Sequence, residues 1–332
     1  MTRFLMYISY LGTRFRGIQK QVSRAKPEAE DPFTVQGMLE IALRKFDPVK
    51  VPQVVISSRT DRGVHGLRSA IHVDLEHQSG TNYVPTDLVR GLNKYFDRSH
   101  IAIRVQECQI VPETFHARFS AIKRSYLYRL AVRKPEAPPL ALGNQDLIAQ
   151  IPFWDWRRCY FIQNPEFDVE KFRSSARLLL GEKDFCTFIG ISNKRNRDGS
   201  VKEISTVRVL HSIHISPHQP SIPSDISEPS AHYNYWNIVF CAKSFGYRQV
   251  RRMVGVLVAV AQGKLQQSDV EHMLANPSPE SWKSFVAPAP AYGLYLSNVH
   301  YDTADLILEN GNVVNETKQE ALSLNDHKAS GG

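Results

Sequence analysis

Cysteine is scarce in this chain, and long apolar runs are missing. Four cysteines occur among its 332 residues, at Cys108, Cys159, Cys186 and Cys241, and none belongs to a CxxC pair. This pattern argues against a disulfide-stapled secreted domain and is typical of reduced thiols in an intracellular protein. The longest uncharged apolar run, over residues 253–262, is too short to cross a bilayer, so we expect no membrane span.

Glycine-rich phosphate loops and metal-binding clusters are missing as well. His211, His214 and His218 lie close together, but no companion ligand stands at metal spacing, so we interpret them as part of a strand that leads into a Pro/Ser-rich loop. The N-terminus begins with strand-like alternation and has neither an apolar signal core nor an Arg/Ser-rich presequence. We therefore expect a cytoplasmic, nuclear or mitochondrial protein.

Acidic residues are outnumbered by basic ones. Lys and Arg total 41 against 33 Asp and Glu, which gives a net charge of +8. Such an excess favours a polyanionic partner, because each neutralised phosphate releases counterions, although it also suits a membrane surface. The arginines concentrate near predicted strand ends and one helix start, at Arg59, Arg62, Arg68, Arg118, Arg124, Arg248, Arg251 and Arg252.

The apolar periodicity predicts an α+β protein with two similar halves and a polar tail. In the first half, residues 1–112, strands over 4–11, 53–57, 70–75 and 101–110 and helices over 34–46 and 85–96 follow the β-α-β-β-α-β order of a ferredoxin-like unit. In the second half, residues 113–302, strands are predicted over 123–132, 207–215, 233–243 and 293–301, and helices over 167–180 and 247–263. Residues 135–152 are expected to form an irregular connection, and residues 303–332 a tail without regular structure.

Asp61 is the first candidate for chemistry. It follows a short apolar strand, precedes Gly63 and lies between Arg59 and Arg62. Nearby positive charge favours the ionised form of a carboxylate, so we expect Asp61 to be ionised and nucleophilic at neutral pH. On spacing alone, a turn aspartate that pairs with a neighbouring arginine explains the same pattern equally well.

The predicted helix over 247–263 supplies a partner. It carries no charge from Met253 to Gly263 and should be buried all round, and Arg251 lies on the same side as Val254, Gly255 and Val258. A buried guanidinium without a carboxylate costs about 3–5 kcal/mol, so we predict that Arg251 pairs with Asp61. The alternatives are that Arg251 caps carbonyls or reaches a surface acid.

Tyr126 is the third candidate. It lies on a basic strand with Lys123, Arg124 and Arg129, on the same face as Tyr128. A tyrosine in such a strand can stack on an extruded base, although an inward tyrosine is more often a core residue.

Six segments, in order, make the chain similar to the TruA-type tRNA pseudouridine synthases, and in particular to their eukaryotic pseudouridylate synthase-like members. They are residues 10–21 (YLGTRFRGIQKQ), 58–66 (SRTDRGVHG), 116–121 with 124–128 (HARFSA, RSYLY), 181–188 (GEKDFCTF), 245–255 (FGYRQVRRMVG), and 287–288 with 293–296 (AP, GLYL). This chain departs from the family pattern at Ile18, Arg62, Gly66 and Lys183. The changes at Ile18 and Arg62 bear on the substrate range, because both are expected near the RNA entrance.

The resemblance implies a pseudouridine synthase fold, with a mixed, largely antiparallel sheet and a central basic cleft between the halves. It implies an isomerase that turns uridine into pseudouridine in tRNA, in the anticodon stem-loop, without metal or cofactor. It also implies a homodimer.

The same resemblance assigns roles to individual residues. Asp61 would be the nucleophile or essential base, Arg251 its partner, and Tyr126 the residue that packs on the flipped base and assists proton removal. Arg59 would extrude the nucleotide or hold its phosphate, and Leu294 would line the base pocket. Further RNA contacts are expected from His65, Arg14, Arg16 and Arg248.

Three other interpretations of the sequence remain open. A catalytically silent RNA-binding protein on the same scaffold would have no need of Asp61, Tyr126 and Arg251 together. The sequence gives little support to a hydrolase that uses two carboxylates, since no second acid accompanies Asp61 in its loop. It supports a metal-dependent nuclease even less.

Overall fold

The first half of the chain alternates strands and helices in the predicted order. The computed structural model describes residues 1–21, 29–137, 150–190, 205–226 and 228–308. The elements of the first half are β1 (Thr2–Tyr10), α1 (Val35–Leu43), β2 (Val55–Ile56), β3 (His65–Leu75), α2 (Pro85–Arg98) and β4 (Ile103–Val111). Strand β1 pairs antiparallel with both β3 and β4, and β2 pairs antiparallel with β3. The resulting order β4-β1-β3-β2 is that of a ferredoxin-like unit.

The second half repeats this arrangement with additions. Its elements are β5 (Ala121–Arg133), β6 (Tyr160–Ile162), α4 (Val169–Leu178), β7 (Gly181–Asp184), β8 (Val207–His218), α5 (Glu228–Ala231), β9 (Tyr233–Ala242), α6 (Gln249–Ala261), α7 (Gln267–Ala275) and β10 (Leu294–Tyr301). Strands β5, β8, β9 and β10, with helices α4 and α6, form a second β-α-β-β-α-β unit of order β10-β5-β9-β8, all antiparallel. The prediction of two ferredoxin-like halves is therefore confirmed. The sequence had not suggested β6, β7 or α7.

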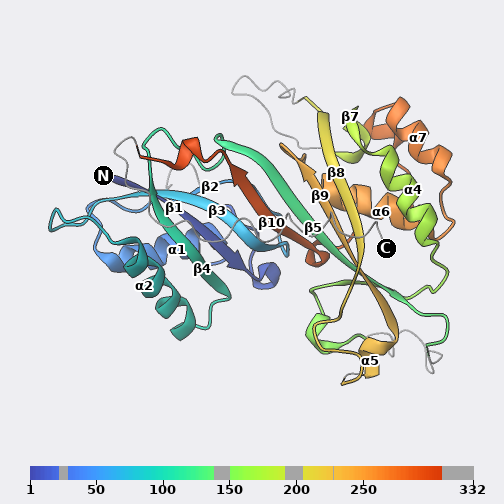
Figure 1. Cartoon of the computed structure of the whole chain (residues 1–332), viewed down its shortest axis with the longest axis horizontal. Coiled ribbons are helices and arrows are strands. Elements are labelled where there is room, and N and C mark those ends of the chain that lie inside the picture. Colours follow the sequence, from blue (N-terminus) through green and yellow to red (C-terminus); the bar gives the residue numbers. More distant parts are fainter. Residues whose placement is uncertain (22–28, 138–149, 191–204, 227, 309–332) are drawn as a thin grey trace, which may run out of the picture.

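The two halves share one ten-stranded, mixed and largely antiparallel sheet of order β4-β1-β3-β10-β5-β9-β8-β7 within the described residues (Figure 1). Strand β2 has two residues and pairs with β3 only at His72 and Ile71, which leaves the beginning of β3 open. There β10 pairs with β3 in parallel, Tyr295 opposite His65 and Leu296 opposite Gly66. The chain segment just before β3 therefore lies where the halves meet.

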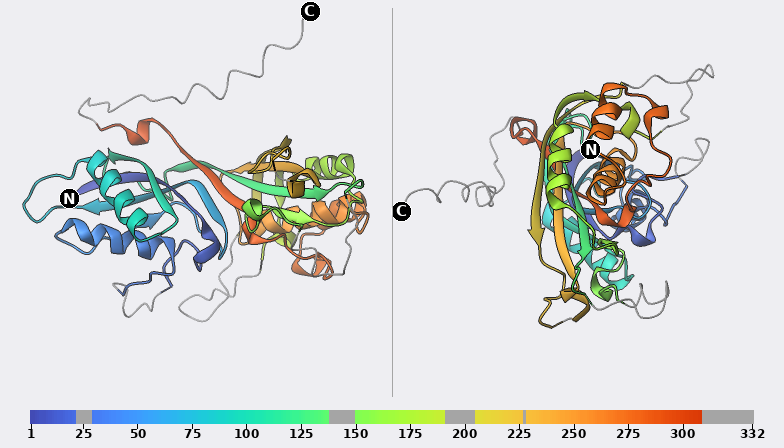
Figure 2. Two further views of the ribbon diagram at one scale, coloured as in Figure 1. Left: turned by 90° about the horizontal axis from the view of Figure 1, so that it is seen from below. Right: turned by 90° about the vertical axis from the view of Figure 1, so that its right-hand side faces the viewer.

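Two main apolar cores support the sheet. Helices α1 and α2 pack their apolar sides, including Leu39, Leu88 and Leu92, with Phe4 and Met6 of β1. A larger core contains α4, α6 and α7 together with Tyr126, Tyr128 and Phe240 of β5 and β9, and it extends to Leu5 and Tyr7 on the other face of β1. Figure 2 shows the sheet nearly edge-on, with most of the helices on one side of it.

Several element boundaries differ from the prediction. Thr34 caps α1 as expected, its hydroxyl accepting from the Gly37 amide at 3.3 Å. Strand β3 begins at His65, five residues earlier than predicted, because β10 supplies a pairing partner there. Helix α6 begins at Gln249, and Arg248 before it has a left-handed φ of 58°.

Three further expectations can be compared with the structure. His211 and His214 lie on β8 as expected, and the strand continues to His218, three residues beyond the predicted end. The change from one half to the other falls between Val111 and Ala121, and the boundary at residue 112 stays a prediction. The start of the expected tail is not irregular, since Ala304–Leu306 forms a 3-10 turn and Leu306 packs against the larger core. Residues 309–332, and 138–149 of the expected connection, lie outside the described residues.

Candidate active site

Asp61 lies in a tight turn between β2 and β3, at the junction of the halves. The Val64 amide donates to the Asp61 carbonyl at 3.1 Å, and Gly63 has the positive φ of 82° that this turn requires. The Asp61 side chain is 29% exposed. Within the described residues its Oδ1 accepts no hydrogen bond and is not fully buried, so this oxygen is free to accept another contact.

The opening loop, residues 11–21, holds the backbone of this turn from one side. The Ile18 amide donates to the Thr60 carbonyl at 3.3 Å, and the Tyr10 hydroxyl shares a 2.8 Å hydrogen bond with Thr60 Oγ1. A side chain at Gly12 would collide with the Val64 carbonyl, and one at Gly17, where φ is 120°, would approach the Thr60 carbonyl to 2.9 Å. Both glycines therefore permit a backbone approach that no other residue allows.

His65 joins the turn to the second half. Its Nδ1 accepts from the Gly12 amide at 3.1 Å, so Nε2 carries the proton and donates to the carbonyls of Arg157 and Tyr292, both at 3.1 Å. Its ring stacks on Tyr295, and burial lowers the pKa of His65 to about 4. The imidazole is therefore neutral and buried, and both of its nitrogens are hydrogen-bonded. The predicted direct contact of His65 with RNA does not fit this environment, since its bonds position the Asp61 turn instead.

Arg251 reaches Asp61 from helix α6, 190 residues away in sequence. Its Nη1 donates to Asp61 Oδ2 at 3.3 Å, and the two side chains are 16% and 29% exposed. The predicted pairing is confirmed. Arg251 also caps carbonyls, the alternative considered above, because its Nε donates to the Ala289 carbonyl at 2.7 Å while the Ala289 amide donates back to the Arg251 carbonyl at 2.9 Å. These two bonds fix the position of the Arg251 guanidinium independently of its contact with Asp61.

Tyr126 is a buried residue of β5 in the larger core. The edge of its ring packs on Phe245 with centroids 5.1 Å apart, and its backbone partner on β10 is Leu296. Burial raises the pKa of Tyr126 to about 12, with a further increase from Asp61 and a decrease from Arg124. The phenol is therefore protonated at neutral pH and close enough to Asp61 to sense its charge. Leu294, also buried, lies opposite Tyr128 on the neighbouring strand.

Arg124 links three segments around the site and was not predicted as a site residue. Its Nε donates to Ser58 Oγ at 2.7 Å and its Nη2 to the Ser57 carbonyl at 3.0 Å. The same Nη2 donates to the Arg118 carbonyl at 2.8 Å, and Nη1 donates to the Lys243 carbonyl at 2.6 Å. One buried guanidinium thus ties the segment before Asp61 to the turn before β5 and to the segment that leads into α6.

A strand argument could have found Arg124. Tyr126 and Tyr128 were expected on one face of β5, and Arg124 precedes Tyr126 by two residues, so it belongs to the same inward face. The observed burial pattern alternates in this way. What the sequence could not supply was the set of acceptors, because all but Ser58 Oγ are backbone carbonyls, and those of Ser57 and Lys243 lie far away in sequence.

The other predicted RNA contacts lie at or near the surface around the turn. Arg59 is exposed, and partial burial together with the charge of Arg118 lowers its pKa. Arg14 is also exposed, whereas Arg16 pairs with Asp31 at 2.9 Å and lies over the Phe33 ring. Arg248 is exposed beside the ring of Tyr247. These positions permit contacts with a polyanion.

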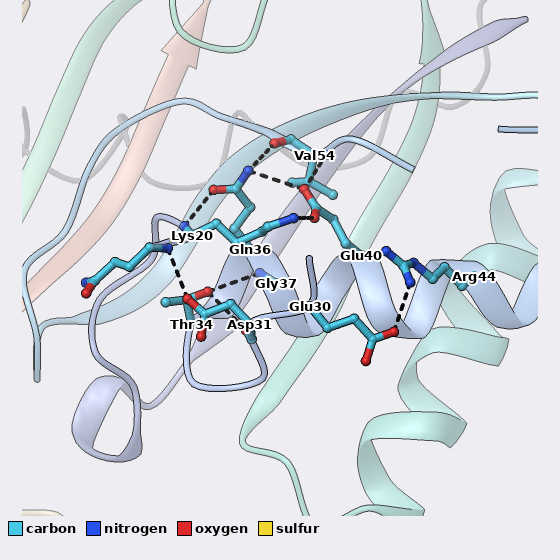
Figure 3. A network of polar contacts seen from close by, with 10 residues as sticks. Lys20, Glu30, Asp31, Thr34, Gln36, Gly37, Glu40, Arg44 and Val54 are labelled. Carbon is cyan, nitrogen blue, oxygen red and sulfur yellow. Dashed lines mark hydrogen bonds and ion pairs between the residues drawn. The ribbon is translucent and has the colours of Figure 1, made fainter. Parts of the chain in front are cut away.

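A buried polar network connects the opening loop to α1 and to the strand that leads to Asp61 (Figure 3). The Lys20 ammonium pairs with Glu40 at 2.8 Å, with both side chains buried. The other oxygen of Glu40 accepts from the Val54 amide at 3.1 Å and from Gln36 at 3.3 Å. Gln36 in turn bonds the Lys20 amide and the Val54 carbonyl. The network therefore fixes both segments that determine the position of the turn.

No helix in the described part of the chain has both the length and the apolar character that crossing a membrane requires. No group of three or more His, Cys, Asp or Glu side chains in the same part of the chain is placed to hold a metal ion.

The chain is similar to known proteins over most of its length. A family described as tRNA pseudouridine synthase matches residues 175–302. The mouse protein "tRNA pseudouridine synthase-like 1" is 35% identical over 301 residues, which are 90% of this chain and 94% of that protein. The Xenopus laevis protein of the same name is 31% identical, covering 97% and 98%. "tRNA pseudouridine synthase A" of Ruegeria sp. is 31% identical, covering 91% and 96%.

One solved structure, a Cbf5-Nop10-Gar1 complex, aligns over 77% of this chain and 44% of that one, with a TM-score of 0.27 and 8% identity. A likeness this low supports no inference about fold or function.

The buried Lys20–Glu40 pair generates a stability prediction. Glu40→Gln removes the carboxylate that the Lys20 ammonium contacts, so we expect the free energy of unfolding in urea to fall by about 3–5 kcal/mol. Glu30→Gln is the matched control, because Glu30 pairs with Arg44 at 2.9 Å but is more than half exposed. A change of about 0–1 kcal/mol is expected there. Equal losses in the two variants would contradict a structural role for the buried network.

Proposed function

The chain belongs to the tRNA pseudouridine synthase family, and we propose that it isomerises uridine to pseudouridine in tRNA with Asp61 as the essential carboxylate. The observation that carries this proposal is the contact of Asp61 with Arg251 across the junction of the two halves, beside Tyr126. A purely structural ion pair has no need of a free carboxylate oxygen or a neighbouring buried phenol.

The reaction is balanced without an oxidant or a transferred group. The C1′–N1 glycosidic bond breaks, the uracil turns, and a C1′–C5 bond forms while the proton at C5 leaves and N1 gains one. The protein must supply a carboxylate, a cation that keeps it ionised, and a site that retains the detached base. The target base must also leave its stack, which costs a few kcal/mol that contacts with the RNA have to offset.

The side chains of this site suit these tasks. Arg251 holds Asp61 through one oxygen and leaves the other to attack the sugar or assist elimination. Tyr126 is a neutral phenol at physiological pH because its pKa is raised to about 12, so it packs on the base and donates a hydrogen bond rather than acting as a free phenolate. Leu294 lines the pocket, and Arg59 extrudes the nucleotide or holds its phosphate.

We infer that the substrate site is the anticodon stem-loop of tRNA and that the protein works inside the cell, in the cytoplasm or mitochondrion. The net charge of +8 and the exposed Arg14, Arg59 and Arg248 support an RNA partner. The free state of the described cysteines supports a reducing compartment.

The first test follows tritium release from uridine-5-tritiated tRNA transcripts. We expect release by the wild type and a loss of about 10²–10⁴-fold or more in Asp61→Asn, because this variant keeps the shape but loses the charge of the carboxylate. Asp87→Asn, an exposed aspartate on α2, serves as the control and should behave as wild type. Equal release by wild type and Asp61→Asn would exclude the assigned mechanism.

Binding of the same transcripts separates the two functions that the scaffold allows. Asp61→Asn should bind them as the wild type does. A wild type that binds tRNA and releases no tritium from any transcript would favour the catalytically silent RNA-binding protein instead.

Arg124 should act as a positioning residue for this reaction. Arg124→Gln removes donors from carbonyls at three segments, so we expect kcat to fall by about tenfold or more while KM changes little, since small displacements of reacting groups are costly. Arg104→Gln is the control: Arg104 bonds Asp97 and two carbonyls around the start of β4, the edge strand of the sheet. It should lower stability and leave kcat unchanged. A similar fall in kcat for both variants would show that Arg124 stabilises the fold and has no specific positioning role.

We also propose a homodimer. Sedimentation equilibrium at micromolar protein should then give a mass near twice 37.7 kDa. A single species at the monomer mass would contradict the dimer and would leave the proposed reaction untouched.

A further inference from the structure

The turn between β4 and β5 presents an exposed aromatic ring close to the Asp61 turn. Phe119 is 74% exposed, an unusual environment for a phenylalanine. The Arg118 guanidinium lies 5.6 Å from the centre of its ring, and the His116 ring lies 4.3 Å away with a tilt of 34°. Cation and ring therefore stand side by side on the surface.

This turn is rigid rather than frayed. His116 Nδ1 accepts from the amides of Arg118 and Phe119 at 3.1 and 3.3 Å, and the Ser120 hydroxyl accepts from the His116 amide at 3.0 Å. Burial and the charges of Arg3 and Arg118 lower the pKa of His116, so its ring is neutral at physiological pH. The exposed phenyl ring is thus held in place before any ligand arrives, which lowers the entropic cost of binding.

Arg124 connects the turn to the active site. The same Nη2 donates to the carbonyls of Arg118 and Ser57, and Nε bonds Ser58, so the turn and the segment before Asp61 converge on one guanidinium. Arg59, two residues before Asp61, is close enough to Arg118 for its pKa to be lowered by that charge. Within the described residues neither arginine has an acidic partner.

Two arginines without an acidic partner lie beside an aromatic ring that is held in place. This arrangement suits the binding of single-stranded nucleic acid. Arginine neutralises the phosphate, and the ring stacks on a base of any identity. We propose that Arg118 and Phe119, with Arg59, form a second nucleotide subsite that binds the residue next to the target uridine: its base on Phe119 and its phosphate between the two arginines. This subsite rests on the proposed function for its context, but its binding chemistry is independent of the reaction.

The test measures binding of a fluorescein-labelled oligouridylate by anisotropy over a series of salt concentrations. Phe119→Ala should weaken binding at least about fivefold at every salt concentration, because a stacked base contributes about 1–3 kcal/mol. Arg118→Gln should lower the slope of log Kd against log salt by about 0.7, the value for one phosphate contact on a single strand. Phe119→Tyr should restore the affinity. Both side chains are exposed, and the backbone bonds of the turn do not depend on them.

Two matched controls lie outside the cluster. Phe153 is 75% exposed with no arginine of the described residues over its ring, and Arg98 is an exposed arginine at the end of α2. Phe153→Ala should leave the affinity unchanged, and Arg98→Gln should leave the salt slope unchanged. Equal effects of Phe119→Ala and Phe153→Ala on affinity would overturn the stacking role. An unchanged slope in Arg118→Gln would overturn the phosphate contact.

Kinetics on tRNA transcripts distinguish this proposal from the proposed function. If the wild type releases tritium, Phe119→Ala should raise KM and leave kcat nearly unchanged, since it removes binding shared by substrate and transition state. A fall in kcat at constant KM would contradict the subsite. If the wild type releases no tritium while the oligouridylate results hold, the subsite stands and the isomerase assignment fails.

Discussion

The contact of Arg251 with Asp61 constrains the whole arrangement, because it is made between the two ferredoxin-like halves of the sheet. The Arg251 side chain is 16% exposed, and its carboxylate partner lies 190 residues away in sequence. The contact forms only if α6 packs in the correct position against residues 287–289. It also requires that the start of β3 places the Asp61 turn within reach of Arg251. Most of the features described around the site secure one of these two conditions.

The Asp61 turn is restrained from three directions. The opening loop approaches it through Gly12, Gly17 and Tyr10, Arg124 holds Ser57 and Ser58 before it, and His65 holds the residue after it to the second half. Most of these bonds use backbone atoms, so they fix position without adding charge near the carboxylate. Two of the surrounding groups carry charge: Arg251 pairs with Asp61, and the charge of Arg124 lowers the pKa of Tyr126.

Sequence reasoning reached the strand and helix pattern, the ferredoxin-like halves and the Asp61–Arg251 pair because each rests on local periodicity or on the cost of burying a charge. It did not reach β7 and α7, whose short or weak apolar patterns carry little periodic signal. It assigned His65 to RNA on the resemblance to the family alone. The burial of the His65 ring depends on β10, a strand 230 residues later, and no local pattern reports such pairing. The roles of Asp61, Tyr126 and Arg251 in chemistry stay predictions.

The repeated topology also explains why the site lies where it does. Both halves have the strand order 4-1-3-2, but the second strand is twelve residues long in the second half, as β8, and two residues long in the first, as β2. A full-length β2 would pair with β3 as far as His65, so β10 would find no unpaired edge of β3 to join. The short β2 leaves that edge open, so the last strand of one half completes the sheet of the other. The freed chain between β2 and β3 becomes the Asp61 turn, and the same strand pairing brings β5, with Tyr126 and Arg124, beside it. A single shortened strand thus accounts for both the joining of the halves and the presence of the Asp61 turn at their junction.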